Sequence, residues 1–266
     1  MGKPKKMYVC SECGYKSIRW VGQCPSCGSW DSLVEDVSSP EVSSKSQARP
    51  QSTELLSSIK AKALVRKSTG LPEFDRVLGG GLVPGQVILI GGEPGIGKST
   101  LLTQLSKSMS DTSVLYLCGE ESPQQVKIRA NRMKYDGRNL HLLTSTDVDS
   151  LIATLEEQSD FGLVIVDSIQ TLTSSDSTGM AGSISQLRVC TQKLTRTAKK
   201  LGIPIIIVGH ITKGGELAGP KVLEHIIDTV LYLEGDSQRL FRILRTTKNR
   251  FGPISEVGIL KCRKQA

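Results

Sequence analysis

Short apolar runs alternate with amphipathic stretches through the central part of the chain. The apolar runs have the length and β-branched content of buried strands, and we predict strands at 87–91, 114–118, 140–144, 163–167 and 203–209. The stretches between them carry apolar residues at helical spacing, and we predict helices at 98–109, 122–134, 147–158 and 183–201. This alternation is typical of a mostly parallel sheet with helices on both faces, so the sequence predicts an α/β core.

The pattern changes on both sides of this alternating region. Before it, Ser68–Leu78 is predicted to form a short capped helix that ends at three successive glycines, residues 79–81. After it, strand-like runs at 228–234, 239–247 and 254–261 follow one another without intervening helices. Consecutive strands of this kind predict an antiparallel extension at the edge of the sheet.

The N-terminal part of the chain has a different composition. Residues 36–62 are rich in serine, proline, glutamine and lysine, and we interpret them as a flexible linker. Residues 1–35 contain two C-x2-C pairs, formed by Cys10, Cys13, Cys24 and Cys27. We therefore predict a small module at 1–35, a linker at 36–62 and the α/β domain at 63–266.

The cysteine spacing predicts a zinc ribbon. Each C-x2-C pair lets two thiolates converge on one ion, and two pairs complete a closed tetrahedral site, which is structural rather than catalytic. Disulfides are the alternative, but they need an oxidising compartment, and the three further cysteines scattered through the α/β domain favour the reducing cytosol. Since so small a module cannot build a core of its own, we expect Zn²⁺ to hold its fold together.

Charge and composition narrow the partners. The chain of 266 residues has a formal charge of +8, a pI near 9.1 and 38% hydrophobic residues. A Zn²⁺ ion with four thiolates lowers the charge to about +6. The positive charge is typical of a protein with an anionic partner, nucleic acid first, but on composition alone a charge kept only for solubility is an equal alternative. No apolar run approaches the length of a membrane span, and no apolar signal segment follows Met1, so we expect a cytoplasmic protein that binds no membrane.

The most specific motif is Gly92-Glu93-Pro94-Gly95-Ile96-Gly97-Lys98-Ser99, followed by Thr100, between a predicted strand and a predicted helix. Glycines let successive backbone N–H groups turn toward phosphates, and the helix directs its positive end at the anion. Lys98 is predicted to bind the β- and γ-phosphates, and the Ser99 hydroxyl to bind Mg²⁺. Residues 92–100 are therefore a predicted nucleoside triphosphate site.

Acidic residues end two of the predicted strands. Asp167 ends the strand at 163–167 and is predicted to bind Mg²⁺ directly or through water, although strand-end aspartates also serve as turn or capping residues. Glu120 and Glu121 follow the strand at 114–118, which we expect to neighbour the phosphate loop. We predict that Glu120 orients or deprotonates the attacking water, with Glu121 as the second choice; the alternative is that both acids favour the start of the next helix.

Other polar residues are weaker candidates. His210 directly follows the strand at 203–209 and could sense the γ-phosphate, or serve only as a structural residue. Lys248 and Arg250 lie at a turn between edge strands, where they could reach the γ-phosphate of a neighbouring subunit or only protect the edge. The loops at 174–182 and 213–221 follow strands with site residues, and could contact a second ligand or simply connect elements.

These motifs together resemble one family. The four-cysteine ribbon, the phosphate loop, Gly119-Glu120-Glu121-Ser122, Gly209-His210-Ile211-Thr212-Lys213 and Lys248-Asn249-Arg250-Phe251-Gly252 are similar to those of the bacterial RadA (Sms) family of DNA repair proteins. The resemblance covers nearly the whole chain. Members of that family continue into a domain similar to the Lon protease fold, whereas this sequence ends at Ala266 before such a domain.

The resemblance implies a RecA-like P-loop ATPase with the cofactors ATP, Mg²⁺ and Zn²⁺. It implies an oligomeric ring that binds single-stranded DNA, acts with a RecA-type recombinase and promotes branch migration of recombination intermediates. The family's Walker lysine falls on Lys98 and its Walker B acid on Asp167. By similarity to RecA, Glu120 takes the place of the water-activating glutamate, and the two loops take the places of DNA-binding loops.

Two functions remain open from the sequence. The first is a DNA-stimulated ATPase; the second is a KaiC-like regulatory module whose ATP state controls protein assembly. The ribbon and the positive charge favour the first. Aromatic residues are only 4% of the chain, so we expect lysine and arginine contacts to the DNA backbone to outweigh base stacking.

Overall fold

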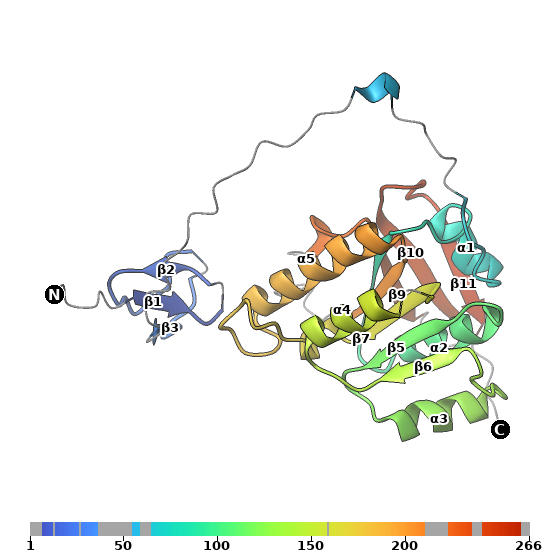
Figure 1. Cartoon of the computed structure of the whole chain (residues 1–266), viewed down its shortest axis with the longest axis horizontal. Helices are drawn as coiled ribbons and strands as arrows, with labels where there is room; N and C mark the ends of the chain where they lie inside the picture. Colours follow the sequence, from blue (N-terminus) through green and yellow to red (C-terminus); the bar gives the residue numbers. More distant parts are fainter. Residues whose placement is uncertain are drawn as a thin grey trace. The chain divides into compact units, whose positions relative to one another are not determined.

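The computed structural model describes residues 7–12, 14–26, 28–36, 55–58, 65–158, 160–210, 223–235 and 241–261. The chain separates into two compact units, Met1–Val65 and Arg66–Ala266 (Figure 1). Within the described ranges, no helix combines the length and apolar character needed to cross a bilayer.

The N-terminal unit contains a small antiparallel sheet. Its strands β1 (Met7–Cys10), β2 (Lys16–Ser17) and β3 (Leu33–Asp36) lie in the order β2-β1-β3. Cys10, Cys24 and Leu33 are buried together beside this sheet. A short 3-10 helix, η1 (Leu56–Ser58), falls within the predicted linker, most of which lies outside the described residues.

The larger unit is built on a mostly parallel sheet, as the sequence predicts. Its order is β11-β10-β9-β4-β8-β7-β5-β6. The bounds are β4 Val87–Gly92, β5 Val114–Cys118, β6 Leu140–Leu143, β7 Leu163–Asp167, β8 Ile205–His210, β9 Thr229–Gly235, β10 Phe241–Asn249 and β11 Val257–Lys261. The crossover connections return each of the strands β4 to β9 to the same edge, so their carboxyl ends face one side of the domain.

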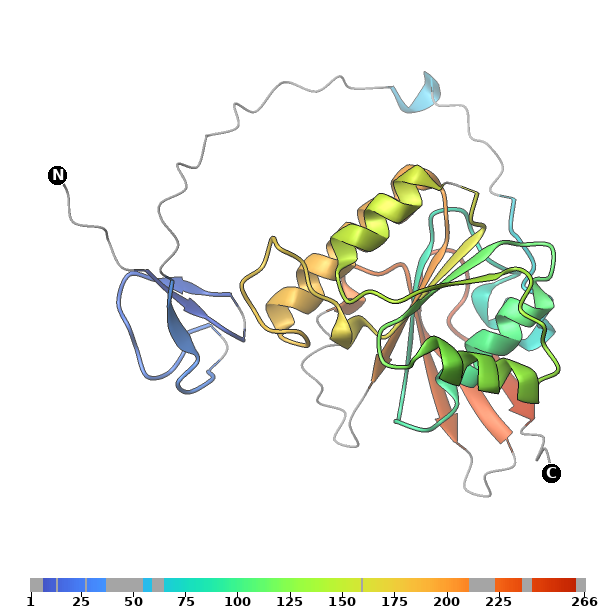
Figure 2. The same cartoon turned by 60° about the horizontal axis from the view of Figure 1, so that its bottom comes forward.

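Helices cover both faces of this sheet (Figure 1, Figure 2). They are α1 Pro72–Leu78, α2 Lys98–Ser108, α3 Pro123–Arg132, α4 Val148–Glu157 and α5 Ile184–Leu201, with a 3-10 turn, η2, at Ile169–Thr171. Alternate residues of β4 enter different cores: Val87 and Leu89 pack with α4 and α5, whereas Ile88 and Ile90 pack with α1 and α2. The continuous apolar runs of the sequence reflect this burial on both faces.

The C-terminal strands differ in part from the prediction. β10 and β11 form the expected antiparallel extension, but β9 pairs in parallel with β4, from Ile88 opposite Thr229 to Gly91 opposite Tyr232. The chain therefore returns from β8 to the amino edge of the sheet before β9 begins. That return lies mostly outside the described residues.

Candidate nucleotide site

The predicted phosphate loop joins β4 to α2. Its glycines adopt backbone angles that other residues rarely take: φ is 75° at Gly95 and 109° at Gly97, which precedes the first residue of α2. Gly92 is required for another reason, because a Cβ there would lie 2.6 Å from the backbone oxygen of Leu233 on β9. The loop therefore packs directly against the neighbouring strand before it turns into the helix.

Lys98 is held over this loop. Its side chain is buried, and Nζ donates hydrogen bonds to the carbonyl oxygens of Gly92 at 2.9 Å and Glu93 at 3.0 Å. Burial lowers the pKa of Lys98, while the negative charges of Asp167 and Glu120 oppose that shift. The lysine and both predicted acids thus lie within electrostatic reach of one another.

Asp167 ends β7 and is 5% exposed. Its Oδ2 accepts a hydrogen bond of 2.5 Å from the hydroxyl of Tyr116, a β5 residue that is itself buried. Behind Tyr116 lies Arg129 of α3, whose Nη2 is 3.5 Å from the tyrosine oxygen. Tyr116 stands inside an apolar run and Arg129 on an amphipathic helix, so the sequence analysis missed both; a tyrosine within an otherwise aliphatic strand is the signal that could have found them.

Glu120 and Glu121 leave β5 in different directions. The sequence led us to expect β5 next to the phosphate-loop strand β4, and this is wrong: β8 and β7 lie between them. Parallel crossovers need not place successive strands side by side. Glu120 instead approaches the site through β7, where it accepts a hydrogen bond from the hydroxyl of Ser168, next to Asp167. Glu121 forms an ion pair with Arg129 at 2.5 Å.

Gly119 allows the chain after β5 to lie close to the end of β7. Its N–H donates to the carbonyl oxygen of Asp167 at 2.7 Å. A Cβ at Gly119 would lie 2.2 Å from Oγ1 of Thr171 and 3.1 Å from that carbonyl oxygen. A side chain at this position would therefore push Glu120 away from the end of β7.

An arginine near the start of β10 forms a hydrogen bond with the phosphate loop. Arg242 of β10 donates from Nε to the carbonyl oxygen of Ile96 at 2.9 Å. Gly235, at the end of β9, also lies against the loop: a Cβ on Gly235 would lie 3.2 Å from Cδ1 of Ile96. The sequence analysis did not identify Arg242, because the sequence alone does not show that β10 reaches this edge.

His210 ends β8 between the phosphate-loop strand and the Asp167 strand, and its backbone is in register with Gly92. This places residue 210 at the same edge of the sheet as the loop. The predicted loop at 213–221 lies outside the described residues.

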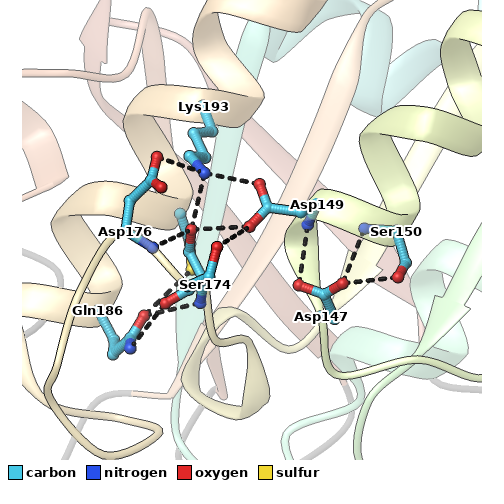
Figure 3. A network of polar contacts seen from close by, with 9 residues as sticks. Asp147, Asp149, Ser150, Ser174, Asp176, Gln186 and Lys193 are labelled. Carbon is cyan, nitrogen blue, oxygen red and sulfur yellow. Dashed lines mark hydrogen bonds and ion pairs between the residues drawn. The ribbon is translucent and has the colours of Figure 1, made fainter.

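The other predicted loop, 174–182, is firmly held at its base (Figure 3). Gln186 of α5 donates from Nε2 to the carbonyl oxygens of Ser174, Ser177 and Gly179, and accepts from the N–H of Ser174. Lys193 lies between Asp149 at 2.6 Å and Asp176 at 2.7 Å. These ion pairs join α5 to both the loop and α4. The lysine side chain is only 20% exposed, so solvent screens them less than it screens pairs on the surface.

Lys248 and Arg250 lie at the other end of the strands, level with the start of β4 and away from the phosphate loop. β10 runs antiparallel to β9, so Asn249 pairs with Thr229, which is itself opposite Ile88 near the start of β4. There Arg250 donates to Asp228 at 3.0 Å, and Lys248 donates to the carbonyl oxygen of Glu224. Within one chain these two cations therefore do not join Lys98; a role at the phosphates requires a second subunit.

The ribbon repeats one turn at both cysteine pairs. After Cys10, the N–H of Gly14 donates back to the carbonyl oxygen of Cys10 at 2.9 Å; after Cys24, Gly28 does the same at 2.8 Å. The two glycines share one backbone conformation, with φ of 73° at Gly14 and 74° at Gly28. Cys13 and Cys27 lie outside the described residues, but the duplicated turns and the shared burial of Cys10 and Cys24 fit a four-thiolate metal site.

Comparison with known proteins identifies the larger unit. A family model described as "AAA domain" matches residues 53–216, more than half of the chain. The chain belongs to the AAA domain family. The matched range includes the phosphate loop, Glu120 and Asp167. A second model, described as "Rubredoxin metal binding domain", matches residues 8–35 and agrees with the metal-binding interpretation of the ribbon.

The similarity to one relative extends over the whole chain. DNA repair protein RadA of Bacillus subtilis (strain 168) is 46% identical over 100% of this chain and 59% of its own length. The chain thus spans about three fifths of that relative, and the resemblance to RadA proteins inferred from the motifs is confirmed.

Solved structures agree on the fold. The RadB recombinase has a TM-score of 0.58 at 25% identity and covers 74% of this chain and 96% of its own. The ATPase domain of G40P has a TM-score of 0.59 at 16% identity, with 72% and 85% covered. The larger unit therefore has the RecA-like fold predicted from the sequence.

Proposed function

We propose that this chain is an ATPase of recombinational DNA repair, whose hydrolysis is stimulated by single-stranded DNA and drives branch migration of recombination intermediates. The observation that carries the proposal is the gathering of Lys98, Glu120 and Asp167 at one edge of the sheet, beside a glycine-rich loop and in a chain similar to RadA. The geometry supports triphosphate binding, and the similarity supports its use in repair.

Each residue has a distinct role in this proposal. The amides of residues 92–100 and the ammonium of Lys98 bind the phosphates. Ser99 and Asp167 hold Mg²⁺, which when bound neutralises charge on the β- and γ-phosphates. Glu120 orients the attacking water and accepts its proton, while the Ser168 hydroxyl holds the carboxylate in place.

The ribbon has a structural metal in this proposal. Cys10, Cys13, Cys24 and Cys27 hold Zn²⁺, consistent with the duplicated turns around Cys10 and Cys24. The closed set of four thiolates leaves no open position for substrate, so the ribbon takes no part in hydrolysis.

DNA and neighbouring subunits complete the proposed assembly. The charge of +8 favours contacts to the DNA backbone, and the loops at 174–182 and 213–221, which follow site-bearing strands in the sequence, are the proposed DNA-binding segments. In a homo-oligomeric ring, we propose that Lys248 and Arg250 of one subunit meet the γ-phosphate of the next, because within one chain they lie away from the phosphate loop. A RecA-type recombinase is the proposed protein partner.

The test is steady-state ATP hydrolysis with and without single-stranded DNA. We expect the wild-type rate to rise with DNA and the rise to shrink steeply with salt. Lys98→Ala should abolish both, whereas Lys107→Ala, which removes an exposed lysine of the same helix, should behave like the wild type. Nucleotide-dependent assembly with no effect of DNA on turnover would contradict the proposal and favour the regulatory module.

A further inference from the structure

We propose that Tyr116 and Arg129 position the carboxylate of Asp167 for divalent-cation binding. The inference rests on the proposed function, because it concerns how the chain prepares its own metal ligand. Neither residue belongs to the phosphate loop or to the acids that the sequence singled out.

The Tyr116 hydroxyl is committed to Asp167. The side chain is 1% exposed and packs in the core between the sheet and α2, where an unbonded hydroxyl is costly. Its bond engages Oδ2 of Asp167. A phenol carries its proton at neutral pH, so the hydroxyl is the donor and the carboxylate is the acceptor of this bond.

Arg129 determines which way that hydroxyl points. The guanidinium has donors and no acceptor, so with Nη2 at 3.5 Å the tyrosine oxygen can only accept from it. The hydroxyl proton is then directed at Asp167. A carboxylate held by a directed donor loses rotamer freedom, which is how residues behind a metal ligand raise metal affinity.

The guanidinium itself is fixed on two further sides. Nη1 forms the ion pair with Glu121, and Nε donates to Oγ1 of Thr103 at 3.0 Å. Thr103 in turn donates to the carbonyl oxygen of Ser99 at 2.8 Å. The side chain of Arg129 is only 8% exposed. One planar group thus connects the helix after the phosphate loop, through Tyr116, to the acid on β7, an arrangement that lysine could not reproduce.

The test compares Tyr116→Phe with Tyr135→Phe. Tyr135 is also a buried tyrosine, but its hydroxyl donates to Asn139 at 2.7 Å, so it controls for the loss of one buried hydrogen bond. Mn²⁺ serves as the probe, and its affinity for the protein–ADP complex is measured by electron paramagnetic resonance. ADP affinity is measured by calorimetry in metal-depleted buffer without chelator, so that the ribbon keeps its metal.

We expect Tyr116→Phe to weaken Mn²⁺ binding about tenfold and to leave the affinity for ADP without added metal unchanged. Tyr135→Phe should change neither. Arg129→Lys retains the charge but not the planar fork, and should weaken Mn²⁺ binding in the same direction by a smaller factor; it also serves if Tyr116→Phe does not fold.

Mn²⁺ affinity equal to wild type in the folded variants would overturn the inference while leaving the proposed function intact. Equal loss in Tyr116→Phe and Tyr135→Phe would also overturn it, since the effect would then be general destabilisation. Absence of ADP binding by the wild type would overturn both the inference and the proposed function.

Discussion

The ribbon and the larger unit maintain their folds in opposite ways. In the described part of the ribbon, the buried apolar cluster consists of Cys10, Cys24 and Leu33, while both tryptophans of the chain, Trp20 and Trp30, are exposed by 54% and 73%. The larger unit instead buries complete apolar layers on both faces of its sheet. The comparison teaches that a few residues at fixed spacing can specify a fold if a metal joins them, whereas a metal-free fold needs a long apolar pattern.

Metal removal should produce the largest difference between the two units. We expect a zinc chelator to unfold the ribbon completely, because structural zinc contributes roughly 10 kcal/mol or more to such modules. Tryptophan fluorescence then reports on the ribbon alone, since the larger unit has no tryptophan. The helical circular dichroism should persist. Fluorescence that does not respond to metal loss would contradict the account.

A cavity in the core of the larger unit should have the converse effect. Leu151 on α4 is fully buried, and Leu151→Ala should destabilise that unit by about 2–5 kcal/mol. Denaturant titration should show the helical transition moving to lower concentration while the tryptophan transition stays in place. If the two transitions shifted together, the units would not fold independently.

Substitution of a glycine by alanine should destabilise the larger unit by a smaller amount and leave the ribbon unaffected at a matched position. We expect Gly119→Ala to cost about 1–3 kcal/mol and to lower ATP hydrolysis, because the added Cβ meets backbone atoms at the end of β7. Gly22→Ala in the ribbon is the matched control: there the added Cβ meets indole carbons at 3.8 Å, an ordinary contact. Thermal melts and turnover rates of both variants decide the point, and normal turnover in Gly119→Ala would show that the close approach of β5 to β7 is dispensable.

The smallest effect concerns the proton on Lys98. Burial lowers its pKa in the free protein, and bound phosphates would raise it again. In the alkaline range just below the ordinary lysine pKa of 10.5, triphosphate binding should therefore take up a fraction of a proton, and affinity should fall as pH rises through the lysine's pKa in the free protein. Calorimetry in two buffers of different ionisation enthalpy measures the uptake. Lys107→Ala should match the wild type, and release of protons on binding would show that the phosphates do not raise the pKa of Lys98.

The sequence predicted the elements well but not their neighbours. Strands β4, β5 and β7 begin and end within a residue of expectation, because apolar runs bounded by turn residues are local signals. Sheet order is a long-range property, so the separation of β5 from β4 and the parallel pairing of β9 could not be read from local patterns.

The site residues were predicted where a local motif marks them and missed where their role depends on contacts between distant elements. Lys98, Asp167 and Glu120 carry recognisable motifs, and the sheet brings them together. Tyr116, Arg129 and Arg242 act through contacts between elements distant in the sequence, and none carries a motif.

Equilibrium binding tests the central claim, that the loop around Lys98 binds a nucleoside triphosphate, most directly. Calorimetric titration with Mg²⁺ and a non-hydrolysable ATP analogue should show one nucleotide per chain for the wild type and for Lys107→Ala. Lys98→Ala should weaken binding by about 2 kcal/mol or more, because the phosphates lose a buried charged partner. No binding heat for the wild type at any temperature, or undiminished affinity in Lys98→Ala, would contradict the account.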